Sequence, residues 1–198
     1  MIHRQRIALV IPVVLAIAQL AGNASPAAQG GGDQKSTRVA LAGSSAEPGE
    51  AVLIPIYINP GPGLEIGKIK VEVNYVSANM KYEKSDPGTS IDSSTMDFQT
   101  EVNDGKNDKG VDTQTIAVSA ALKSPQSAKS GIPSGLLAFL TLRLSKNGRP
   151  AVITLRTTAE GSELKSGKAL ENIQIEDAKV EVLAEGTEPA VACFFFTH

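Results

Sequence analysis

The segment Asn103–Asp112, NDGKNDKGVD, holds a dense set of oxygen ligands that could bind a metal. Asp104, Asp108 and Asp112 are spaced by four, and calcium binds several converging carboxylate and carbonyl oxygens. The ligand order of an EF-hand is absent, and two lysines in the segment would compete for the carboxylates. We therefore interpret the segment as a solvated loop, keep calcium binding as the alternative, and predict no cofactor.

Side chains for nucleophilic or acid–base catalysis are scarce. Of the two histidines, only His198 remains if an amino-terminal signal is removed. A Ser-His-Asp or Cys-His mechanism needs a base held inside a folded site, for which the final residue of this sequence is poorly placed. Carboxylate pairs can hydrolyse glycosides, but Asp and Glu fall mostly in expected loops or on outward strand positions. The sequence therefore predicts a non-catalytic protein.

The single cysteine, Cys193, lies in an apolar carboxy-terminal tail that we assign to residues 185–198. One cysteine forms no intrachain disulfide, so the fold must depend on its hydrophobic core. In an oxidising compartment an unpaired thiol favours intermolecular pairing or covalent capture, which makes Cys193 a candidate attachment thiol. The alternative is that the run Ala190–Phe196, too short to span a bilayer, folds back over an open edge.

Charge and aromatic content limit the class of partner. The chain has 19 basic and 21 acidic residues, and losing Arg4 and Arg6 with a signal leaves 17 against 21. This mild acidity argues against a nucleic-acid partner, which requires a basic stripe. Glycan platforms need exposed rings, yet the sequence has no Trp, three Tyr and five Phe. We expect a protein partner, with a glycan as the alternative.

The amino-terminal residues have the pattern of an export signal. A basic MIHRQR is followed by the apolar IALVIPVVLAIAQLAG and by the small residues of NASPAAQ. We predict a signal peptide over residues 1–24, cleaved after Ala24, then a flexible leader over residues 25–37. The apolar run is shorter than the roughly 20 residues of a membrane span. The mature protein is thus expected to be secreted, extracellular or at the cell surface, without a stable membrane span.

The remaining sequence has the period of two that is typical of strands. In IKVEVNY the inward positions are Ile69, Val71, Val73 and Tyr75, and the outward positions are Lys70, Glu72 and Asn74. Pro55 interrupts the preceding run AVLIPIYI and predicts a bulge where that strand bends between two sheets. The polar region Ser85–Asp112 is expected to hold one short strand, Met96–Val102, between two loops.

Further strand-like runs are TQTIAVSAAL, LLAFLTLRL, AVITLRT, NIQI and AKVEVL, separated by Gly, Pro, Asn and Asp. No long amphipathic helix is evident, so the fold class is predicted to be an all-β antiparallel sandwich. In the later strands we expect Leu137, Phe139, Val180 and Val182 in the core.

The order of these runs resembles the cohesin domain, the receptor module that binds dockerin modules in cellulosomes and related assemblies. GEAVLIPIYI resembles the family's Gly-x-x-Val-x-Val-Pro-Val opening, and KIKVEVNY its Phe-x-Leu-x-Tyr strand. ANMKYEK, SGIPSGLLAFLTLRL and IQIEDAKVEV resemble the segments that follow, so the match covers Val39–Leu183. The resemblance implies a jelly-roll sandwich of about nine strands over residues 38–184 and a binding role without catalysis.

The resemblance also implies a binding face, on which this sequence departs from the family. Family members often present Asn and Asp outward just before the Tyr strand, where this chain has Lys68 and Lys70, and Val76 and Ser77 replace the usual Asp-Pro. The candidate partner-binding residues are Lys68, Lys70, Glu72 and Asn74. We expect them to bind a dockerin-like protein, in an assembly that degrades extracellular polysaccharide. The alternatives are an ordinary solvated sheet face, a carbohydrate-binding module, and a self-assembling surface subunit.

Overall fold

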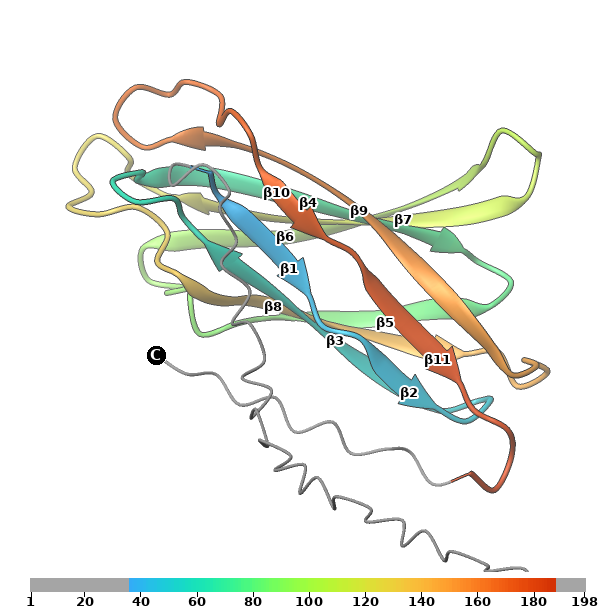
Figure 1. The fold of residues 1–198 in the computed structure, drawn as a ribbon. Coiled ribbons are helices and arrows are strands. Elements are labelled where there is room, and N and C mark those ends of the chain that lie inside the picture. The colour runs from blue at the N-terminus through green and yellow to red at the C-terminus, as the bar shows by residue number, and fades with distance from the viewer. Residues whose placement is uncertain (1–35, 188–198) are drawn as a thin grey trace, which may run out of the picture. The chain divides into compact units, whose positions relative to one another are not determined.

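The computed structural model describes residues 36–187, which form two β-sheets packed face to face (Figure 1). The expected signal peptide, the expected leader up to residue 35, and Cys193 with the end of the expected tail lie outside the described residues. No helix within this range is long and apolar enough to cross a membrane.

Eleven strands are present in the described part of the chain. The five-stranded sheet has the spatial order β10 (Gln174–Glu176), β1 (Arg38–Leu41), β3 (Ala51–Asn59), β8 (Gly135–Leu144) and β5 (Met80–Pro87). The six-stranded sheet has the order β2 (Ser44–Ala46), β11 (Ala178–Val182), β9 (Ala151–Glu163), β4 (Ile66–Val76), β7 (Asp112–Leu122) and β6 (Met96–Lys106). The predicted all-β jelly-roll sandwich is confirmed.

The first and last strands of the fold each pass from one sheet to the other. Each is therefore divided into two shorter strands, so the structure has more strands than the nine or so that were expected. β1 pairs with β10 in one sheet, and β2 pairs with β11 in the other, both in parallel. Gly43 lies at the first crossing, where a Cβ atom would stand 2.7 Å from the carbonyl oxygen of Lys179. Only glycine allows this close backbone approach.

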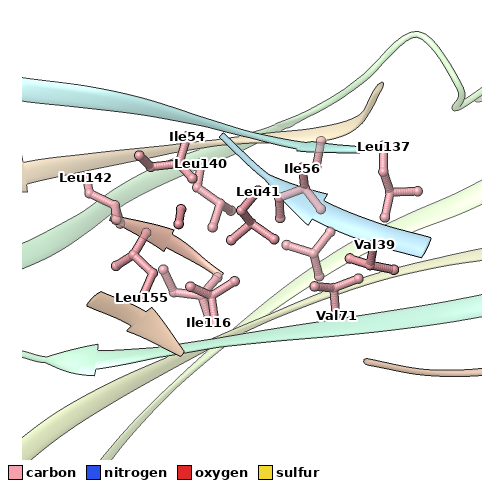
Figure 2. Packing of buried hydrophobic residues seen from close by; sticks show 14 of the residues in the cluster. Val39, Leu41, Ile54, Ile56, Val71, Ile116, Leu137, Leu140, Leu142 and Leu155 are labelled. Carbon is pink, nitrogen blue, oxygen red and sulfur yellow. The ribbon is translucent and has the colours of Figure 1, made fainter. Parts of the chain in front are cut away.

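Aliphatic side chains from both sheets fill the space between the layers (Figure 2). The alternation predicted for β4 is confirmed, because its four inward residues are buried while its polar residues face outward. The other predicted core residues that are buried are Leu137, Val180 and Val182. Each fully buried aliphatic side chain contributes about 1.5–3 kcal/mol, so this core alone stabilises the sandwich without a disulfide.

The prediction that Phe139 lies in the core is wrong. The pairing of β3 with β8 shifts between Ile56 and Tyr57, which leaves Leu137 without a partner. Leu137 and Ala138 are both buried, so the alternation changes phase between them. Phe139 is therefore half-buried on the outer face of the five-stranded sheet.

Pro55 lies beside this irregularity, but the predicted bend between sheets is wrong. β3 stays in one sheet along its whole length, and the segment that crosses is β1–β2. The carbonyl oxygen of Pro55 accepts a hydrogen bond of 3.1 Å from the backbone N–H of Ala42, just after β1 ends. The nitrogen of Pro55 therefore faces the point where the pairing of β3 with β1 ends. The N–H that proline lacks has no strand partner there, so the sheet loses no hydrogen bond.

The region predicted to be mostly loop is a long hairpin. β6 continues past Val102 to Lys106, and β7 starts at Asp112 after a short turn. In that turn Asn107 Oδ1 accepts 3.0 Å hydrogen bonds from the N–H groups of Lys109 and Val111. The strand predicted over Met96–Val102 is present, but its continuation to Lys106 escaped prediction because both faces are exposed there, so no apolar alternation marks it.

Candidate partner-binding face

The four candidate residues of β4 form one row on the outer face of the six-stranded sheet. β4 is paired along its length with β7 on one side and β9 on the other. Because β4 places Ile69, Val71 and Val73 in the core, its intervening side chains must point to solvent. The structure thus aligns the predicted row at the centre of a four-stranded surface.

Strand pairing adds outward residues from three neighbouring strands, and we call the whole set the β4 face. Its members are Lys68, Lys70, Glu72 and Asn74 of β4; Arg156, Thr158, Glu160 and Ser162 of β9; Thr115, Ala117, Ser119 and Ala121 of β7; and Asp97, Gln99, Glu101 and Asn103 of β6. Sequence reasoning missed the last three groups, because only register decides which residues flank Lys70. The alternation in β7 and β9 indicates which of their residues point outward, but it does not indicate which residues of β4 lie beside them.

Lys70 lies in an acidic environment. Its Nζ atom is 2.6 Å from Glu72 Oε1 and 3.9 Å from Glu160 Oε1. The hydrogen bond to Glu72 is the main cause that raises the pKa of Lys70, followed by the charges of Glu72, Glu160 and Glu101. Lys70 therefore stays protonated, and its neighbours compensate most of its charge.

Other charged groups on the β4 face have no ion-pair partner in the described part of the chain. Lys68, Arg156, Asp97 and Glu101 form no ion pair within residues 36–187. Asn74 differs, because its Nδ2 donates a 2.8 Å hydrogen bond to Thr115 Oγ1 and is held in place.

Small side chains make the middle of the β4 face flat. Ala117, Ser119 and Ala121 stand beside the β4 row, and no aromatic ring is among the described residues of the set. Three cations and four carboxylates are interspersed over the face. A flat surface of mixed charge suits the complementary surface of another protein better than a small molecule, which needs a concave site.

A partly buried polar contact holds β4 relative to the opposite sheet. The Tyr75 hydroxyl donates to Gln114 Oε1, which also accepts a 3.3 Å hydrogen bond from the N–H of Tyr82 in β5. Burial raises the pKa of Tyr75, so this hydroxyl remains a donor well above neutral pH. The contact links β4, β7 and β5 and thereby fixes one end of the β4 face.

The carboxylates of the segment Asn103–Asp112, beside the β4 face, do not converge on one point. Gln114 Nε2 donates a 2.9 Å hydrogen bond to Asp104 Oδ1, and Lys106 Nζ is 2.5 Å from Asp112 Oδ1. Within residues 36–187, no three His, Cys, Asp or Glu side chains are arranged to hold a metal ion.

The crossing end strands and the two antiparallel layers define a jelly-roll sandwich that presents one flat polar sheet. A family model, the cohesin domain, matches residues 37–182. The chain belongs to the cohesin domain family, as the order of its strand motifs predicted.

Solved cohesin structures share this fold at low sequence identity. The seventh ScaB type I cohesin of Pseudobacteroides cellulosolvens has 19% identity, covering 82% of this chain and 98% of its own, with a TM-score of 0.58. A Coh-OlpC–Doc435 cohesin–dockerin complex of Clostridium thermocellum has 18% identity, 74% and 93% coverage, and a TM-score of 0.57. A non-cellulosomal cohesin of the archaeon Archaeoglobus fulgidus has 13% identity, 76% and 94% coverage, and a TM-score of 0.54. No curated protein sequence matches this chain.

Proposed function

We propose that this chain is a non-catalytic cohesin module that binds a dockerin-like protein through the β4 face. The observation that carries the proposal is the four-stranded outer surface of β9, β4, β7 and β6, in which unpaired Lys68, Arg156, Asp97 and Glu101 surround a flat centre. Membership of the cohesin family and the likeness to structures solved as cohesin–dockerin complexes support it.

The location and setting form part of the same proposal. The basic, apolar and small-residue segments of residues 1–24 support export, so the module acts outside the cell or at its surface. The partner then belongs to an extracellular assembly, for which polysaccharide degradation is the setting that the family suggests. The likeness to a non-cellulosomal cohesin makes the setting a separate question from partner binding.

A variant that neutralises both lysines of the β4 face tests the partner site. Lys68→Gln/Lys70→Gln removes one unpaired cation and one that bridges two carboxylates, without adding negative charge beside Glu72 and Glu160. Biolayer interferometry against a panel of recombinant dockerin modules should show wild-type binding and at least about tenfold weaker binding by the variant, about 1.4 kcal/mol.

The matched control is Lys81→Gln/Lys84→Gln on the opposite sheet. Lys84 pairs with Asp86 at 2.7 Å and Lys81 has no ion pair among the described residues, so the pair repeats the charge pattern of Lys70 and Lys68. The control should bind like wild type, and all three proteins should melt within a few degrees of one another.

The competing functions have their own readouts. Equal affinity for all three proteins would place the dockerin site elsewhere, and no binding to any dockerin would refute the partner. Affinity electrophoresis in soluble cellulose or xylan would reveal carbohydrate binding, and sedimentation at increasing concentration would reveal self-assembly. If no dockerin bound, slower migration in the polysaccharide gel would favour carbohydrate binding, and a sedimentation coefficient that rises with concentration would favour self-assembly.

A further inference from the structure

A groove of about 590 Å³ lies beyond one end of the β4 face, between the β4–β5 turn, the β8–β9 turn and β11. The residues that matter here are Val76, Asn79, Arg149, Val152, Arg156 and Val182, and we call it the arginine groove. Arg156 belongs to both surfaces, since it pairs with Asn74 across the sheet. The groove therefore continues the β4 face rather than standing apart from it.

The charge of the arginine groove has one sign. Arg149 and Arg156 are its only charged lining residues, and neither forms an ion pair within residues 36–187. On the neighbouring strand β11, Lys179 lies opposite Thr154 and Glu181 lies opposite Val152, so one charge of each sign borders the groove. Two uncompensated guanidinium groups in one concavity are unusual in a chain with a formal net charge of −2.

The groove also has an apolar component. Val152 is 61% exposed, the most exposed of the large hydrophobic residues described, although it lies in a paired strand, near the start of β9. Behind it, Ile153 and Val182 are buried and line the floor. Arginine is one of the residue types enriched where a few side chains carry most of the binding energy of an interface.

We propose that the arginine groove binds an acidic segment of a partner polypeptide, with carboxylates on Arg149 and Arg156 and an aliphatic side chain on Val152. A guanidinium group donates two parallel hydrogen bonds to a carboxylate, which favours Asp or Glu over a neutral residue. The aliphatic side chain would remove the exposed surface of Val152 from water. This contact extends beyond the proposed function, since it requires no dockerin and uses only Arg156 of the β4 face.

The probe is a matched set of short synthetic peptides added to the full chain with 13C-labelled methyl groups. Asp-Leu-Asp at the centre of the peptide should shift the methyl resonances of Val76, Val152 and Val182, and Asn-Leu-Asn at the same positions should shift them at least about tenfold less at equal concentration. Because screening weakens exposed ion pairs, raising the salt from 50 to 300 mM should reduce the affinity severalfold.

Two variants define the site. Arg149→Gln/Arg156→Gln should abolish the shifts, whereas Lys81→Gln/Lys84→Gln on the opposite sheet should preserve them. Three results would overturn the proposal: no shift at about 5 mM peptide, equal shifts with both peptides, or shifts confined to other methyl groups.

Deleting residues 188–198 is the remaining test, because that segment begins with Glu188 and contains an apolar run. If the deletion alone moves the three resonances, the chain's own tail occupies the groove and the partner proposal fails.

The test separates this proposal from the proposed function. Dockerin binding that depends on Lys68 and Lys70 would stand even if no acidic peptide bound the groove. Conversely, peptide binding at Val152 would stand even if no dockerin bound the chain.

Discussion

At the scale of single residues, two lysines on neighbouring outward positions of β4 have opposite surroundings. Lys70 is held by Glu72 and lies near Glu160, whereas Lys68 forms no ion pair in the described part of the chain. A partner bound as proposed would have to displace carboxylates to reach Lys70 but would meet Lys68 directly. Lys68 is therefore expected to contribute more to specificity, although the sequence presents the two as equivalent.

Adjacent residues of β8 allow a prediction about side-chain direction. Leu140 is fully buried and points inward, while Phe139 is half-buried on the outer face. Leu140→Ala should lower the free energy of unfolding by about 2–5 kcal/mol, because it opens a cavity between the sheets. Phe139→Ala should cost less than half as much, since solvent already reaches the ring. Urea denaturation of both variants measures the difference, and an equal loss would show that Phe139 is enclosed in the core.

At the scale of elements, the divided end strands determine how the two sheets are joined. β1 and β10 lie at one edge of the five-stranded sheet, and their continuations β2 and β11 lie at one edge of the other. At the second crossing Asp177 Oδ1 accepts a 2.8 Å hydrogen bond from the backbone N–H of Thr157. The two crossings run side by side and close the same side of the sandwich (Figure 1).

The close backbone approach at the first crossing predicts that Gly43 does not tolerate a side chain. Gly43→Ala would place a Cβ atom 2.7 Å from the backbone oxygen of Lys179, and backbone in a paired strand has little freedom to move. The variant should lose about 1–3 kcal/mol of stability, the usual cost of overpacking.

Gly105→Ala in β6 is the matched control. Its new methyl group would meet only Thr113 Oγ1 at 3.6 Å, an ordinary contact, so stability should change by less than about 0.5 kcal/mol. Thermal unfolding compares the two variants. If Gly43→Ala melted like the control, the β1–β2 crossing would not be closely packed.

At the scale of the whole molecule, one aliphatic core stabilises the sandwich. The core draws on both sheets, and the chain has a single cysteine. The outer surfaces are distinct: the β4 face has mixed charge, the arginine groove is positive, and the outer face of the five-stranded sheet includes half-buried Tyr57 and Phe139. The β4 face and the arginine groove share Arg156, whereas the outer face of the five-stranded sheet lies on the opposite side of the sandwich.

The whole-molecule prediction concerns the thiol. Because the core needs no disulfide, reductant and Cys193→Ser should each leave the melting temperature unchanged. A non-reducing gel of the full chain, recovered from an oxidising compartment, then tests the candidate attachment through Cys193. A reducible dimer or conjugate that disappears in Cys193→Ser would support it. A monomer with a protected thiol, together with lower stability after deleting residues 190–198, would instead support a tail that covers an edge of the sandwich.

Local sequence was sufficient to predict the fold class and the direction of the β4 side chains. A strand with one buried face must alternate, so Ile69, Val71 and Val73 already imply that Lys70 and Glu72 point to solvent. The breakers between runs located most strands, and the order of the runs indicated the cohesin family.

Tertiary structure decided what depends on register between distant segments. The shift at Ile56 turned Phe139 outward, and hydrogen bonding to β7 extended β6 through residues whose two faces are both exposed. The neighbours of Lys70 on β9, and the groove between the β4–β5 turn, the β8–β9 turn and β11, follow from packing between elements far apart in the chain. Alternation specifies which face a side chain occupies, but only pairing specifies what stands beside it, because a strand can register with its neighbour in many ways of similar local energy.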